Sequence, residues 1–188
     1  MHQIEPYLNW QKYYRAERDV RSPFFGRDYG NEYVNDVYGY FIDPLWDEFG
    51  SETLYCKILY TDYARNCCII ELFGEWNDTL HNDIMHFKRT VIDRLTRNGI
   101  DKFILIGENL LQFHGGDRDY YEEWTEEIED GWIAAINLRP HVIQEMTRIR
   151  LDYFINLGGT LEITNWRTAK PNQLFELINQ LMMRRLGA

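Results

Sequence analysis

The stretch LYCKILYTDYARNCCIIELF, residues 54–73, decides the fold of this chain. Its first seven residues alternate, as expected of a strand with one buried face. TDYARN follows with Asp62 and Asn66 as turn-forming residues, and CCIIELF is an apolar, β-branched run typical of a second strand. The sequence therefore predicts a β-hairpin.

A helix and a third strand are predicted directly after the hairpin. Asp78 is placed to cap a helix over residues 79–97, and Asn98-Gly99 is a typical helix end. FILIG, residues 103–107, lacks polar alternation, which is typical of a parallel strand covered on both faces. Apolar residues that would share one face of the helix are Leu80, Ile84, Phe87, Val91 and Leu95.

Strand and helix continue to alternate toward the C-terminus. We expect an acidic helix near residues 120–128, a strand at 132–137, a helix between Pro140 and Gly158-Gly159, a strand at TLEIT (160–164) and an amphipathic helix after Pro171. The predicted class is α/β, in the order β-β-α-β-α-β-α-β, with helices packed on a mixed sheet. Three sets of apolar residues mark the buried faces of these helices: Tyr121, Trp124 and Ile128; Val142, Met146, Ile149 and Tyr153; Leu174, Leu177, Ile178, Leu181 and Met182.

The chain divides into three predicted parts. Residues 1–50 form an arm rich in aromatic residues, which must bury its rings on the core or on a partner. Residues 51–168 form the α/β domain, and residues 169–188 form the C-terminal helix.

Three stretches of the α/β domain resemble the STAS family, the domain of anti-sigma-factor antagonists and of the cytoplasmic tails of anion transporters. IIELFGEWNDTL (69–80) is similar to the family's strand that ends in Gly-Glu-Leu-Asp and leads into the first helix. FILIGENLLQFHGGDRDYYEEW (103–124) has the layout of the strand and loop before the second helix. IAAINLRPHVIQEMTRIRLDYF (133–154) resembles the strand, Pro-bearing turn and helix that end in a Leu-Asp pair.

The resemblance implies a STAS-like fold and a role in protein contacts, with one departure. Antagonist-type members carry a phosphorylatable Ser or Thr before the second helix, where this chain has His114, Gly115, Gly116 and Asp117. No hydroxyl side chain occurs between Gly107 and Tyr120, so a phosphorylation switch is not expected at that position. Asp117 would mimic a constantly charged state.

Composition restricts the partners. The net charge is -10, with 30 acidic and 20 basic residues, so the chain repels nucleic acid and anionic lipid surfaces. No apolar run is long enough to span a membrane. Cys56, Cys67 and Cys68 lie in apolar runs without metal-ligand spacing, which indicates buried thiols in a reducing compartment, and the cytoplasm is the expected location. No cofactor and no metal is expected.

Two features, a cluster of carboxylates and a glycine turn, each allow a functional and a structural interpretation. Glu71, Glu75, Asp78 and Asp83 cluster around the first strand-to-helix junction, where acid–base chemistry or plain helix capping would explain them. The Gly115-Gly116 turn either exposes N–H groups to an anion or is an ordinary loop that needs positive φ.

We expect a non-enzymatic interaction module in intracellular signalling or regulation. Its partner would meet the loop from Asn109 to Asp119 and the acidic helix that follows. Two alternatives are a hydrolase that uses Glu75, Asp78, Glu108 and His114, and a homo-oligomer, such as a homodimer, built by the arm or the C-terminal helix. The expected partner-binding residues are Glu108, Asn109, His114, Gly115, Gly116, Asp117, Asp119 and Glu122.

Overall fold

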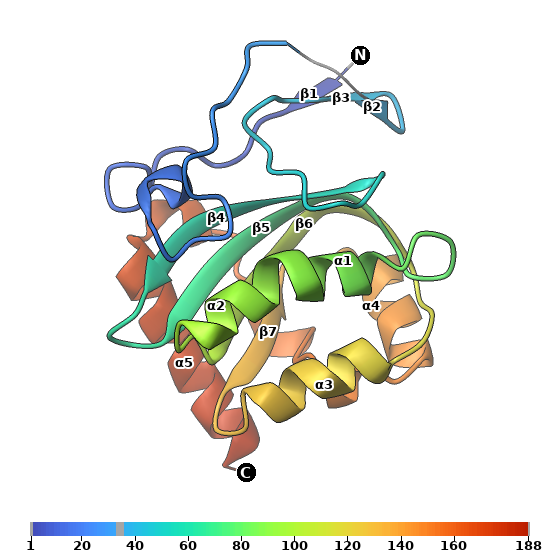
Figure 1. Ribbon diagram of the computed structural model, residues 1–188. Coiled ribbons are helices and arrows are strands. Elements are labelled where there is room, and N and C mark those ends of the chain that lie inside the picture. The colour runs from blue at the N-terminus through green and yellow to red at the C-terminus, as the bar shows by residue number, and fades with distance from the viewer. Residues whose placement is uncertain (1, 33–35, 188) are drawn as a thin grey trace.

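The predicted hairpin is confirmed by the computed structural model, which describes residues 2–32 and 36–187. Strand β4 (Leu54–Asp62) pairs antiparallel with β5 (Cys67–Asn77). β5 pairs in parallel with β6 (Lys102–His114), and β6 pairs in parallel with β7 (Trp132–Ile136). The strand order β4-β5-β6-β7 gives the predicted mixed sheet, with helices on it (Figure 1).

Helices α1, α2, α3 and α4 cover one face of this sheet, and the first two are parts of one continuous helical segment (Figure 1). α1 (Asp83–Phe87) continues through a π-helical turn (Lys88–Ile92) into α2 (Asp93–Arg97). α3 (Asp119–Glu127) and α4 (Pro140–Arg148) complete the layer. The core of this layer contains Ile84, Phe87, Val91 and Leu95 from the first helical segment, Tyr121, Trp124 and Ile128 from the α3 region, and Val142 and Met146 from α4, as predicted.

The opposite face is covered by the two ends of the chain. α5 (Pro171–Leu186) packs on it together with Trp10 and Trp166. A second sheet, in the order β1-β3-β2, lies over the part of that face that holds Tyr55 and Phe73. Its strands are β1 (His2–Ile4), β2 (Asp36–Val37) and β3 (Tyr40–Ile42).

β6 is therefore buried on both sides, as FILIG predicted. Phe103 and Leu105 pack into the layer of α1–α4, while Ile104 and Ile106 pack against the side of α5. The three cysteines are free and buried in the strands, also as predicted. No helix among the described residues is long and apolar enough to cross a membrane.

The aromatic arm packs on its own chain. Trp10 contacts Trp166 edge to face at 5.4 Å between ring centroids, and Trp46 stacks on Phe73 of β5 at 5.4 Å. The expected burial of the arm's rings holds only in part, because Phe25 and Tyr38 are 56% and 58% exposed. Beyond this, the arm has little regular structure apart from its short strands and one 3₁₀ turn (Ala16–Arg18).

The last predicted strand, TLEIT (160–164), does not form, so this prediction is wrong. Gly158 and Gly159 both have positive φ, 66° and 58°, so the chain turns there instead of extending along β7. The segment beside β7 contributes a single bridge, between Ala134 and Asn156, and then 3₁₀ turns. Those turns are Leu151–Tyr153, Gly159–Leu161 and Trp166–Thr168.

Three helix boundaries or faces also differ from the prediction. The first helix begins at Asp83, so Leu80 lies in the preceding turn and is 76% exposed. α4 ends at Arg148, because Arg150 takes a positive φ of 63°, which leaves Tyr153 74% exposed. In α5, Leu177 is 44% exposed and lies outside the buried stripe.

Candidate functional site

Asp78 joins four elements at one end of the sheet. Its carboxylate accepts hydrogen bonds from the Trp76 indole N–H (2.8 Å), the Ile84 backbone N–H of α1 (2.8 Å) and the Tyr121 hydroxyl of α3 (2.6 Å). Its own N–H donates to the His114 carbonyl at the end of β6 (2.8 Å). Burial raises the pKa of Asp78 to about 6. Asp78 is not the predicted N-cap, because the helix begins at Asp83 with Asn82 as its N-cap, but its carboxylate does accept an N–H of the first helical turn.

Glu75 and His114 lie together beside this junction. Glu75 is buried and accepts hydrogen bonds from the Tyr38 hydroxyl and from the Asn77 amide at 2.7 Å. His114 Nε2 is 3.7 Å from Glu75 Oε1, and the imidazole is half exposed. Two of the four residues of the hydrolase alternative, Glu75 and His114, are therefore neighbours.

Glu108 does not join them. Its carboxylate accepts hydrogen bonds from Arg167 and from the Trp166 indole (3.3 Å), on the face of the sheet that α5 covers. It lies six positions before His114 in β6, at most about 20 Å along the strand. The four side chains of the hydrolase alternative therefore do not converge, because β6 continues to His114 and does not end at Gly107 as expected.

Asn109 also lies inside the fold. It is half-buried in β6, and its amide donates to Glu71 at 3.4 Å. Glu71 is fully buried, away from Asp78, and accepts the backbone N–H of Tyr7 at 2.8 Å. Burial raises the pKa of Glu71 to about 7, and Glu108 nearby adds to the rise. The predicted cluster of four carboxylates is thus split between the two faces of the sheet.

The remaining predicted residues share one surface. Asp117, Asp119 and Glu122 are exposed on the short turn after β6 and the first turn of α3. Asp117, through charge repulsion and a hydrogen bond, raises the pKa of Asp119. We call His114, Gly115, Gly116, Asp117, Asp119 and Glu122 the acidic rim.

The two glycines of the acidic rim allow close packing. A β-carbon on Gly116 would lie 3.1 Å from the Asp78 backbone, and one on Gly115 would lie 2.1 Å from the Ile149 side chain. Neither glycine has positive φ, so that predicted reason is wrong. The Thr79 hydroxyl donates to the Gly115 carbonyl at 2.8 Å and fixes the turn further.

A second acidic group, on α2 and α3, is already neutralised. Carboxylate oxygens of Asp93, Glu123 and Glu127 lie close enough together to hold a cation. The buried Lys88 ammonium occupies that place, in contact with Asp93 and 2.6 Å from Glu127. Sequence reasoning missed this cluster, since Lys88 has no periodicity that marks it as buried.

No family model matches the chain, and no curated protein matches it. Among solved structures, the chain is similar to the anti-sigma factor antagonist SpoIIAA in its unphosphorylated form, with 14% sequence identity and a TM-score of 0.44. The similarity covers 71% of this chain and 97% of that chain.

Proposed function

We propose that this protein is a STAS-like interaction module in intracellular regulation, and that it binds a basic protein surface through the acidic rim. The observation that carries the proposal is that hydrogen bonds fix the backbone of the acidic rim while its carboxylates are exposed. Asp78 fixes the backbone of the rim from below, while Asp117, Asp119 and Glu122 project into solvent.

The charge of the rim is poorly compensated within the chain. On the same helix, Glu123 and Glu127 contact Arg89 and Lys88. In contrast, the like charge of Asp117 is the largest influence on the pKa of Asp119 and raises it, while Arg118 lowers it by less. A partner that brings Lys or Arg side chains would relieve this repulsion.

The rigidity of the rim favours binding. Ordering a flexible loop on association costs free energy, and a loop that is already fixed avoids much of that cost. The hydrogen bonds from Asp78 and Thr79 to His114 and Gly115 hold the turn before any partner arrives.

The rim lacks a hydroxyl side chain from His114 to Asp119. We propose that binding is therefore not switched by phosphorylation there, and that Asp117 keeps the surface permanently charged.

Retrieval of partners from the native cell extract tests the proposal. The tagged protein is compared with a variant that carries His114→Ala, Asp117→Ala and Glu122→Ala. The control changes the exposed Asp152 and Glu162, which lie outside the acidic rim and α3, to alanine and so removes the same number of carboxylates. We expect a protein that is retained by the wild type and the control and lost from the rim variant.

Purified partner then completes the test. Binding should weaken as salt rises, because the contact is between opposite charges at the surface. A partner kept by the rim variant, or lost equally from the control, would exclude the rim as the interface. Light scattering of the purified protein would show whether self-association through the arm or α5 explains retention.

A further inference from the structure

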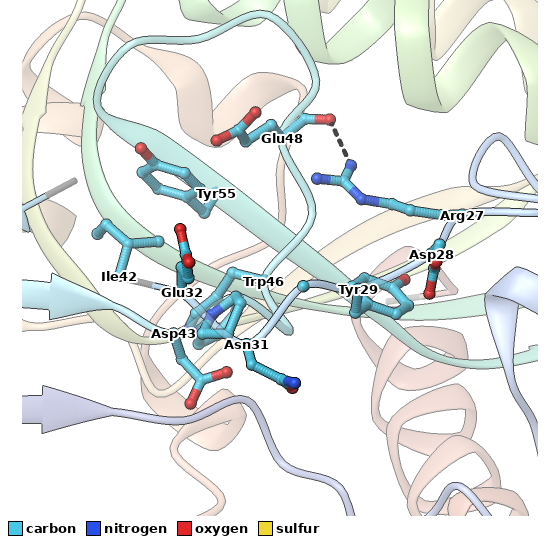
Figure 2. Close-up of a pocket in the computed structure, with 12 residues that line it drawn as sticks. Arg27, Asp28, Tyr29, Asn31, Glu32, Ile42, Asp43, Trp46, Glu48 and Tyr55 are labelled. Carbon is cyan, nitrogen blue, oxygen red and sulfur yellow. Dashed lines mark hydrogen bonds between the residues drawn. The ribbon is translucent and has the colours of Figure 1, made fainter. Parts of the chain in front are cut away.

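A cavity of about 540 Å³ lies in the N-terminal region and is lined by none of the residues of the acidic rim (Figure 2). It is bounded by residues 27–32 on one side and residues 42–48 on the other, with Tyr55 of β4 completing the wall. Ile42, Trp46 and Tyr55 are buried and form its inner surface, whereas Asp28 and Glu32 are exposed at its rim. Pockets for small molecules typically measure about 300–1,000 Å³.

The walls of the cavity are held together by buried Asp47. Its carboxylate accepts a hydrogen bond from the Tyr29 hydroxyl (2.7 Å) and pairs with Arg27 (3.4 Å) and Lys57 (3.2 Å). Arg27 also donates to the Glu48 carbonyl at 3.1 Å, which Figure 2 shows as a dashed line. These contacts fix Arg27 and Tyr29 on one wall to Asp47 and Glu48 on the other, so this part of the cavity is formed before any ligand enters.

Negative charge dominates the lining. Asp28, Glu32, Asp43 and Glu48 contribute carboxylates, and among the described lining residues the cation is Arg27. The guanidinium of Arg27 is already engaged by Asp47 and by the Glu48 carbonyl. With a net charge of -10 on the whole chain, the potential at this cavity attracts cations and repels anions.

Aromatic rings line the same space. Tyr29 contributes a partly exposed ring, whereas Trp46 and Tyr55, each 2% exposed, form the covered floor. Aromatic faces attract ammonium and guanidinium groups. Tyr29 already makes such a contact on the protein side, where Lys57 Nζ lies 3.9 Å from its ring centroid. Carboxylates beside aromatic rings form a favourable environment for an organic cation and a poor one for a neutral or anionic ligand.

We propose that this cavity binds an organic cation, an ammonium or guanidinium group carried on a short aliphatic chain. The same chemistry occurs in a free amine and in a Lys or Arg side chain of a peptide. The size of the cavity accommodates either source.

Isothermal titration calorimetry with agmatine tests the proposal. Asp28→Asn with Glu32→Gln removes two charges at the mouth of the cavity and leaves its buried walls intact. The control, Asp152→Asn with Glu126→Gln, removes the same charge elsewhere on the surface. We expect saturable binding of agmatine that weakens about tenfold or more in the Asp28→Asn, Glu32→Gln variant and is unchanged in the control.

Pentanol and an N-acetylated peptide with one lysine complete the design. Pentanol, which is uncharged, should bind at least about tenfold more weakly than agmatine. Tighter binding of the peptide assigns the site to a partner's side chain, and tighter binding of agmatine assigns it to a free amine. The proposal is overturned if neither cation binds saturably, if pentanol matches agmatine, or if both double variants weaken binding equally. Unfolding midpoints in urea confirm that the variants are folded.

Discussion

Replacing Glu71 with glutamine should stabilise the protein above neutral pH. Glu71 is fully buried in β5, where its carboxylate accepts the Tyr7 N–H and faces Asn109. Glutamine has the same shape, and its carbonyl oxygen can accept the Tyr7 N–H. Its amide group can donate to Asn109 once the Asn109 amide rotates, since both groups carry a donor and an acceptor. The change therefore removes the charge and keeps the hydrogen bonds.

The magnitude follows from the pKa of Glu71. Burial raises this pKa from 4.5 to about 7, so the folded state disfavours the ionised form. The stability that protonated Glu71 contributes is fully present below pH 4.5 and is lost as pH rises through 7. A difference of 2.5 pKa units corresponds to about 3 kcal/mol. Glu71→Gln should thus exceed the wild type by up to about 3 kcal/mol at pH 8.5 and match it near pH 4.5.

Urea unfolding followed by tryptophan fluorescence measures this difference across the pH range. Glu126→Gln, an exposed change on α3, serves as the control and should follow the wild type throughout. If Glu71→Gln is less stable than the wild type at pH 8.5, then Arg167 compensates the ionised carboxylate and the reasoning from burial is wrong.

Three further changes should destabilise the fold, each measured by urea unfolding at pH 7. Asp78→Ala leaves the Trp76 indole and the Tyr121 hydroxyl without their buried acceptor and should cost about 3 kcal/mol, more than the exposed Asp152→Ala. Lys88→Met removes the ammonium between Asp93 and Glu127 and should cost about 3 kcal/mol, because it leaves these carboxylates without their buried cation. Trp10→Ala removes a ring that packs on Trp166 and should cost about 3–5 kcal/mol; a loss below about 1 kcal/mol would mean that the arm contributes little to stability.

The sequence predicts those elements whose hydrophobic pattern fits only one kind of secondary structure. The hairpin, FILIG and α5 follow from runs that only a strand or an amphipathic helix would bury. TLEIT has the same kind of pattern, yet its position after Gly158-Gly159 places it in a turn, and backbone conformation at glycine is not encoded by polarity. The four carboxylates of β5 and the turn after it are close in sequence, but strand residues alternate between faces, which separates Glu71 from Asp78.

The candidate site was predictable only in part. The exposed residues of the acidic rim follow from their polarity and from the helix that begins at Asp119. The interior positions of Glu108 and Asn109 depend on contacts with Arg167 and Glu71, which are 59 and 38 residues away in the chain. The cavity near Trp46 also depends on long-range packing, because residues 27–32 carry no periodic pattern that would fix their place.

Hydrogen exchange would show whether the acidic rim is the interface. Amide exchange of the protein, measured by mass spectrometry with and without the partner recovered by the retrieval experiment, locates the interface on the chain. We expect slower exchange in peptides that cover residues 114–122, with peptides from the arm and from α5 unchanged. Slower exchange confined to the arm or to α5, with residues 114–122 unaffected, would mean that the rim is not the interface.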